Sequence, residues 1–231
     1  MQEISRLHLR FLILIILILS ISYAVVANDR NAANADAEHE STICVPLLDG
    51  CSGNGPGPSG QIFSDNFNSG SDPYWKFDDG WYIVNYQGDI ALRGTRHSFA
   101  VLNNYDIGNF AFRARFKRLS GGLHLCFRLK GLPDGLHRYF VSIDDKRLGL
   151  TKQLGNCQNC FHDMVGTSLN NLDPNWHSIE IRANGGNIRV FIDDFACICY
   201  TDNDPILSGG ISLETLDNSD FLIDDVSISN L

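Results

Sequence analysis

Residues 110 to 129 read FAFRARFKRLSGGLHLCFRL, and apolar and polar side chains alternate along most of this stretch. Side chains of a β-strand point to opposite faces of its sheet with a period of two. The two apolar faces are Phe110, Phe112, Ala114 and Phe116, and then Leu123, Leu125, Phe127 and Leu129. The polar faces opposite them are Arg113, Arg115 and Lys117, and then His124, Cys126 and Arg128. The stretch therefore predicts two half-buried strands.

The same pattern recurs through the rest of the chain. HSIEIRA (177–183) and NIRVFIDDF (187–195) alternate in the same way. Turn-forming pairs such as Asp144-Asp145 and Asp193-Asp194 separate the segments. No segment after residue 27 shows the 3.6-residue period of a helix. Many short strands with one apolar face each predict an all-β fold, a two-sheet antiparallel β-sandwich or jelly roll.

The first 60 residues have a different composition. Arg6 and Arg10 precede the apolar run 11–27, FLILIILILSISYAVVA, which has the form of a secretory signal peptide. At 17 residues, it is also near the shortest length that spans a bilayer, so an uncleaved anchor is the alternative. Residues 28–60 are polar and rich in Gly, Pro, Asn and Ser, which favours a flexible spacer. We expect an exported protein, secreted or held at the cell envelope, with one domain at 61–231.

The formal net charge of −9 excludes some partner classes. Nucleic acids and anionic membranes both repel an acidic surface. The charge is compatible with neutral sugars and with calcium. Membrane attachment, if there is any, is expected through residues 11–27.

The order of several motifs resembles the concanavalin A-like lectin/glucanase superfamily, particularly its laminin G-like members and the 3-keto-disaccharide hydrolase-type domain. The motifs are FSDNFNSGSDPYWKFDDGWYIVNYQGDIAL (63–92), GGLHLCFRL (121–129), RYFVSIDD (138–145), LGLTKQLG (148–155) and FLIDDVSIS (221–229). The resemblance implies a concanavalin A-like jelly roll whose first and last strands pair. It also implies a concave sheet face that binds carbohydrate.

Three strands carry candidate ligand-binding residues on their polar faces. We expect these strands to be neighbours, so that arginines and an aromatic ring together receive a polyhydroxylated or acidic ligand. The alternative is an ordinary solvated sheet face. The candidates are His124, Arg128, Arg138, Phe140, Arg113 and Arg115.

The sequence offers little support for catalysis. Glucanases of this superfamily carry Glu-x-Asp-x-x-Glu on one strand, and that pattern is absent here; Glu214, Asp217 and Asp220 are the nearest acidic group. We therefore expect a non-catalytic, lectin-like module that binds a glycan or polysaccharide. One alternative is a glycoside-acting hydrolase of the 3-keto-disaccharide hydrolase type. Another is a membrane-anchored adhesive or structural ectodomain that binds protein.

Calcium is common in the superfamily that the chain resembles. If the first and last strands pair, Asp65 would approach Asp224 and Asp225, and carboxylate oxygens are the ligands that Ca²⁺ prefers. The alternative is a solvated acidic edge.

Seven cysteines follow the first 27 residues. Export permits disulfides, and an odd count leaves at least one thiol, for which Cys126 is the candidate. Cys44 and Cys51 are expected to close a small loop. Cys157 and Cys160 are expected to form disulfides with Cys197 and Cys199; the alternative is a Zn²⁺ site made of these four thiols, or of three of them and His162.

Overall fold

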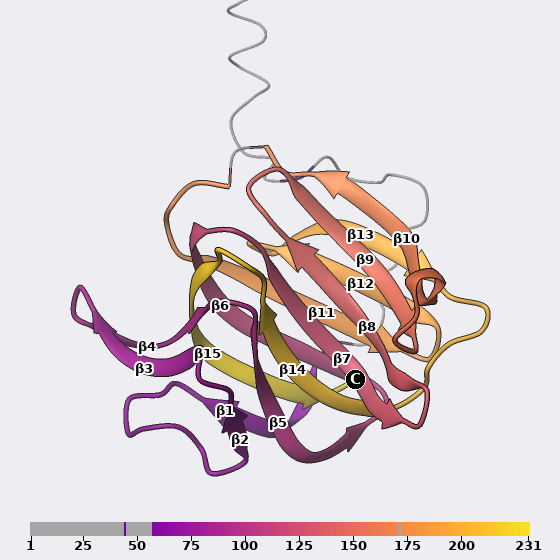
Figure 1. Cartoon of the computed structure of the whole chain (residues 1–231), viewed down its shortest axis with the longest axis horizontal. Coiled ribbons are helices and arrows are strands. Elements are labelled where there is room, and N and C mark those ends of the chain that lie inside the picture. Colours follow the sequence, from indigo (N-terminus) through magenta and orange to yellow (C-terminus); the bar gives the residue numbers. More distant parts are fainter. Residues whose placement is uncertain (1–43, 45–56, 171) are drawn as a thin grey trace, which may run out of the picture. The chain divides into compact units, whose positions relative to one another are not determined.

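The computed structural model describes Cys44 and residues 57–170 and 172–231. The predicted signal or anchor segment, most of the predicted spacer and Cys51 lie outside these residues. No helix of the described residues is long and apolar enough to span a membrane. The described part is almost entirely β-structure, which confirms the predicted fold class (Figure 1).

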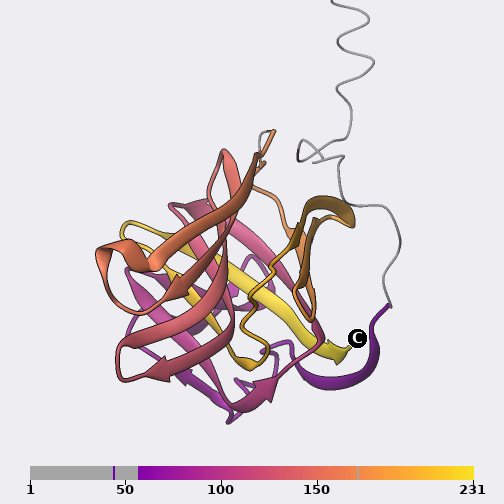
Figure 2. The ribbon, with the colours of Figure 1, turned by 90° about the vertical axis from the view of Figure 1, so that its right-hand side faces the viewer.

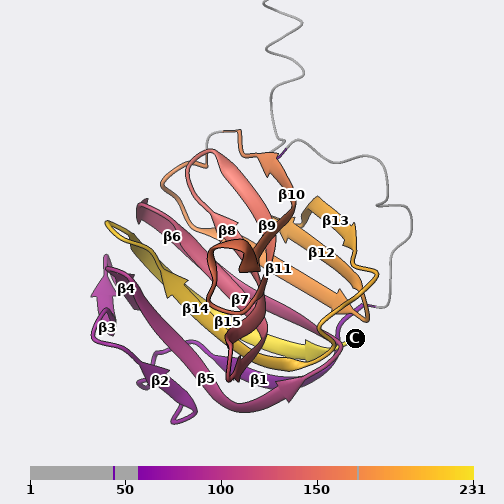
Figure 3. The same ribbon diagram turned by 45° about the vertical axis from the view of Figure 1, so that its right-hand side comes forward.

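The strands belong to two antiparallel sheets, which Figures 1 and 3 show as stacked layers. The seven-stranded sheet has the order β10-β9-β8-β7-β14-β5-β2. Its strands are β2 (Trp75–Phe77), β5 (Ser98–Ile107), β7 (Leu123–Leu132), β8 (Gly135–Ile143), β9 (Arg147–Leu154), β10 (Phe161–Ser168) and β14 (Gly209–Thr215). A single turn of 3₁₀-helix, η1 (Gln158–Cys160), joins β9 to β10.

The eight-stranded sheet has the order β13-β12-β11-β6-β15-β4-β3, with β1 paired to β15 beside this path. Its strands are β1 (Ser59–Asp65), β3 (Trp81–Tyr86), β4 (Asp89–Thr95), β6 (Phe110–Ser120), β11 (His177–Asn184), β12 (Asn187–Ile192), β13 (Phe195–Thr201) and β15 (Asp220–Asn230). Asp65 of β1 is opposite Val226 of β15, so the expected pairing of first and last strands is confirmed (Figure 2).

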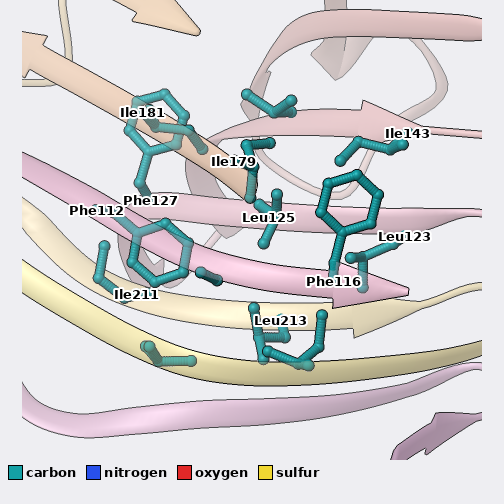
Figure 4. Packing of buried hydrophobic residues seen from close by; sticks show 14 of the residues in the cluster. Phe112, Phe116, Leu123, Leu125, Phe127, Ile143, Ile179, Ile181, Ile211 and Leu213 are labelled. Atoms are coloured by element: carbon teal, nitrogen blue, oxygen red, sulfur yellow. The ribbon is translucent and has the colours of Figure 1, made fainter. Parts of the chain in front are cut away.

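The core lies between the sheets and is built from the apolar faces that the alternation predicts. Leu123, Leu125 and Phe127 of β7 meet Phe112 and Phe116 of β6 across it (Figure 4). Burial of each such side chain contributes about 1.5–3 kcal/mol to the free energy of folding, relative to leaving it exposed. The remaining faces of the two sheets are turned away from the core, and we call them the outer faces.

Candidate functional site

Polar and aromatic side chains line up across the outer face of the seven-stranded sheet. Strand register places Glu214 of β14 opposite His124 of β7, and His124 opposite Ser142 of β8. Gly149 of β9 and Gly166 of β10 continue this line, which we call the Glu214 row. Because side chains alternate, every second residue of each strand joins this face.

A parallel line of residues runs beside the Glu214 row. Ser212, Cys126, Phe140 and Thr151 face one another across β14, β7, β8 and β9. We call this line the Phe140 row. The two rows therefore bring residues that are far apart in the sequence into one surface.

Glu214 is the centre of the polar contacts. Its Oε2 lies 3.0 Å from His124 Nδ1 and 2.8 Å from Arg138 Nη1, and its Oε1 lies 3.1 Å from His97 Nε2. Burial alone would raise the pKa of Glu214, but the hydrogen bond from His124 and the charge of Arg138 lower it to about 2. Glu214 is therefore an ionised carboxylate held in place by three partners.

Arg138 extends this network toward β9. Its Nε donates to Gln153 Oε1 at 2.7 Å, and Gln153 Nε2 donates to Gly155 O at 2.9 Å. Arg138 Nη1 also lies 3.0 Å from Cys126 Sγ. Burial raises the pKa of the Cys126 thiol to about 12, so this thiol is not a nucleophile at neutral pH.

Aromatic rings surround these polar groups. Phe140 stacks on the His124 ring with centroids 4.3 Å apart, and the Arg138 guanidinium lies 5.1 Å from the Phe140 ring and 5.7 Å from Phe99. Phe161, at the start of β10, approaches Phe140 edge-on and is 49% exposed. Phe161 and the His97 side chain are therefore the exposed groups here, and Glu214, Arg138 and Phe140 lie buried beneath them.

The carboxylates on β14 and β10, Glu214 and Asp163, are not arranged as a glycosidase pair. Asp163 of β10 accepts a hydrogen bond from Thr151 Oγ1 at 2.8 Å, and β10 is four strands away from β14 and Glu214. At about 4.8 Å per strand, the two backbones are roughly 19 Å apart. Paired glycosidase carboxylates are about 5–9.5 Å apart. Glu214 and Asp163 therefore do not flank one glycosidic bond.

The structure groups three of the six predicted ligand-binding residues. His124, Arg138 and Phe140 lie together around Glu214, but Arg138 and Phe140 are themselves buried, so of the three only His124 reaches solvent. The interpretation of Arg128 as a ligand-binding residue is wrong, because this side chain is fully buried. A register shift between Phe127 and Lys130, where Arg128 has a φ of 50°, breaks the alternation. The guanidinium donates to the carbonyl oxygens of Gly108, Gly185 and Ile206.

Arg113 and Arg115 lie in the other sheet, so the prediction that all three strands are neighbours is wrong. Their strand, β6, is paired with β11 and β15. Arg113 is ion-paired with Glu180 at 2.7 Å, and the Arg115 guanidinium lies 4.7 Å from the Trp176 ring. Both arginines line a hollow of about 190 Å³ on that outer face.

The residues predicted to bind calcium are close in the fold but have other partners. Both carboxylate oxygens of Asp65 accept backbone hydrogen bonds, from Phe67 and Asp72. Asp224 and Asp225 lie 3.4 and 3.5 Å from Arg115. Asp65 and Asp225 line a hollow of about 410 Å³. These contacts do not favour a cation, and calcium stays a prediction.

The disulfides are present, but their predicted pairing is wrong. Cys44 is bonded to Cys197, and Cys157 to Cys160; Cys199 is disulfide-bonded as well. Pairing depends on which cysteines the fold brings together, and Cys44 lies beside β13 rather than closing a loop with Cys51. Sulfurs in disulfides are not thiolate ligands, so this geometry does not support zinc. Cys126 is a buried free thiol, as expected.

Three residues of the site were not among the predicted ones: Glu214, His97 and Gln153. The signal for Glu214 was present, because Ile211 and Leu213 alternate with Ser212 and Glu214. No local pattern indicates the other two, since their roles depend on register across several strands.

The comparisons with known proteins concern the fold. No protein-family model and no curated protein sequence matches the chain. Among solved structures, the carbohydrate-binding module CBM66 from Bacillus subtilis is similar, with 15% identity, a TM-score of 0.54 and coverage of 68% of this chain and 96% of that one. A galectin-like protein of unknown function from Bacillus subtilis has 13% identity, a TM-score of 0.62 and coverage of 75% and 97%.

The catalytic domain of the laminarinase from Thermotoga maritima is similar as well. It has 11% identity, a TM-score of 0.57 and coverage of 75% of this chain and 99% of that one. The fold is a two-sheet antiparallel sandwich that is similar to the jelly rolls of these proteins. Similarity at this level of identity extends to the fold alone, because this jelly roll carries both binding modules and enzymes.

Proposed function

We propose that this jelly roll is an exported, non-catalytic module that binds carbohydrate through the outer face of its seven-stranded sheet. The observation that carries the proposal is the ionised Glu214, held between His124 and Arg138 beside the rings of Phe140 and Phe161. The disulfides fit an extracellular setting. Structural neighbours that are carbohydrate-binding modules or glycoside hydrolases support the ligand class.

The chemistry of sugars matches this surface. A sugar ring has apolar C–H faces that pack on aromatic rings and hydroxyl groups that need fixed donors and acceptors. Glu214 is buried, and its charge fixes the side chain of His97, which is 52% exposed and can meet a hydroxyl group. Hydrogen bonds to a charged group are stronger than neutral ones, and preorganisation lowers the entropy cost of binding.

Binding without hydrolysis is favoured over catalysis by the carboxylate geometry. Glu214 and Asp163 lie on strands too far apart for the two-carboxylate mechanism, and Glu214 is held charged by an ion pair. A glycan bound here would therefore be released unchanged.

The test is affinity electrophoresis of the full chain against soluble polysaccharides, including laminarin, xylan and galactan, with a parallel assay for released reducing sugar. We expect retention on at least one polysaccharide and no sugar release. Phe161→Ala should weaken binding about tenfold, equivalent to about 1.4 kcal/mol. Phe195→Ala is the matched control, because Phe195 is 47% exposed but lies in β13 of the other sheet.

Two results would contradict the proposal. Retention that survives Phe161→Ala but is lost in Phe195→Ala would move the site to the other sheet. Sustained sugar release that Glu214→Gln abolishes would make the protein an enzyme.

A further inference from the structure

The Glu214 row ends in two glycines. After Ser142 it continues through Gly149 and Gly166. A methyl group at Gly149 would lie 2.8 Å from Ser142 Oγ, and one at Gly166 would lie 2.9 Å from Arg147 Nε. A side chain at Gly149 would therefore displace Ser142, and one at Gly166 would displace Arg147. We call Ser142, Gly149, Gly166 and Arg147 the glycine trough.

Arg147 lies across this trough. Its guanidinium is within 3.0 Å of the methyl position at Gly166 and within 3.9 Å of the one at Gly149. The Ser142 hydroxyl oxygen lies 2.8 Å from the same position at Gly149. The trough thus places a forked cationic donor and a hydroxyl over the backbone of two glycines.

Arg147 differs from the other arginine of this face in its charge balance. Arg138 is buried and neutralised by Glu214 at 2.8 Å. Arg147 is exposed, and none of the carboxylates in the described part of the chain forms an ion pair with it. Asp144 accepts the backbone N–H of Arg147 at 2.8 Å, and Asp163 of β10 accepts the Thr151 hydroxyl in the Phe140 row, but neither carboxylate is ion-paired with the Arg147 guanidinium. The positive charge in the trough is therefore available to a ligand.

A planar guanidinium beside a hydroxyl fits a carboxylate, which accepts two parallel hydrogen bonds from an arginine fork. We infer that the glycine trough binds the carboxylate of an acidic sugar, such as a uronate residue of a glycan. This inference rests on the proposed function and names the ligand class of the same face. The neighbouring sugar rings would lie on the aromatic residues around Phe140.

The test compares one oligosaccharide in two forms, with its carboxylates charged and with them neutralised. Isothermal titration measures binding of an oligogalacturonate of four residues and of the same oligomer with all its carboxylates methyl-esterified. We expect the free acid to bind at least tenfold more tightly. Arg147→Gln should remove this preference and change binding of the ester less than twofold.

Two further variants distinguish the effect of the position of the Arg147 guanidinium from the effect of the protein's overall charge. Gly166→Ala keeps every charge but displaces the Arg147 guanidinium, so it should reduce the preference for the acid as Arg147→Gln does. Arg182→Gln is the matched control, because it removes the same charge from the outer face of the other sheet and should change the preference less than twofold. Thermal unfolding confirms that each variant is folded.

The outcomes distinguish this inference from the proposed function. Equal binding of the acid and its ester, or a preference for the acid that Arg147→Gln leaves intact, would overturn the inference. If neutral polysaccharides are retained and the acid is not preferred, the proposed function stands and the inference fails. If no saccharide is bound, both fail.

Discussion

Glu214 stays ionised although only about 4% of the residue is exposed. Burial opposes the charge, and hydrogen bonds and charges from His124 and Arg138 more than compensate for it. The carboxylate and guanidinium thus depend on each other, because either one alone would be an uncompensated buried charge. At the scale of single residues, this pair determines how the site responds to pH.

Glu214→Gln tests this dependence. The folded pKa of about 2 lies below the ordinary value of 4.5, so the ionised group stabilises the fold above pH 4.5 and this contribution is lost as the pH falls toward 2. The contribution is about 3 kcal/mol. The variant should be destabilised by about 3–5 kcal/mol at pH 7, because Arg138 keeps its charge. It should also lose less stability between pH 4.5 and 2.5, as measured by urea unfolding; equal losses in both proteins would contradict this account.

Arg128 is a second buried charge, with a structural role. Its guanidinium satisfies three backbone carbonyl groups, and Gly209 packs so closely that a methyl group there would be 2.3 Å from the Arg128 carbonyl carbon. Arg128→Leu leaves these carbonyl groups without their donor. We expect a loss of at least about 3 kcal/mol in the free energy of unfolding.

Arg147→Gln is the control for Arg128→Leu, since substitutions at exposed sites usually stay within about 0.5 kcal/mol. Guanidinium-induced unfolding measures both variants. Similar small losses in the two would show that the Arg128 hydrogen bonds contribute little.

At the scale of elements, the alternation of apolar and polar side chains predicts where strands form and which face of each strand is buried. Leu123, Leu125 and Phe127 are buried as this pattern predicts. It fails at Arg128, where a shift in register turns one side chain inward. It also cannot tell that β6 and β7, which follow each other in the chain, belong to different sheets. Arg113 and Arg138 were therefore expected together, although strand pairing over long separations keeps them apart.

The disulfides differ in what they constrain. Cys44–Cys197 spans 153 residues of sequence, and Cys157–Cys160 spans 3. Closing a longer loop removes more chain entropy from the unfolded state. Replacing the first pair with serines should therefore lower the free energy of unfolding by up to about 5 kcal/mol, and replacing the second should lower it by about 1.5 kcal/mol. Urea unfolding of the two double variants compares these losses. Equal effects would contradict the loop-entropy explanation.

At the scale of the whole molecule, the two outer faces have different chemistry. The face of the seven-stranded sheet combines aromatic rings with Glu214 and the glycine trough. The face of the eight-stranded sheet carries arginines paired with acids, as in Arg113–Glu180 and Arg182–Glu180. The sequence predicts the sandwich and a polar outer face, but only register across many strands shows which polar residues meet. The candidate site could therefore be predicted only in part.

The pairing of β1 with β15 has a practical consequence. Ser59 and Asn230 are opposite each other in the sheet, so both ends of the described domain leave from neighbouring strands. The proposed carbohydrate surface belongs to the other sheet. A carrier joined after β15 would therefore leave that surface uncovered. This arrangement makes the domain suitable as a modular probe that displays one recognition face on a carrier.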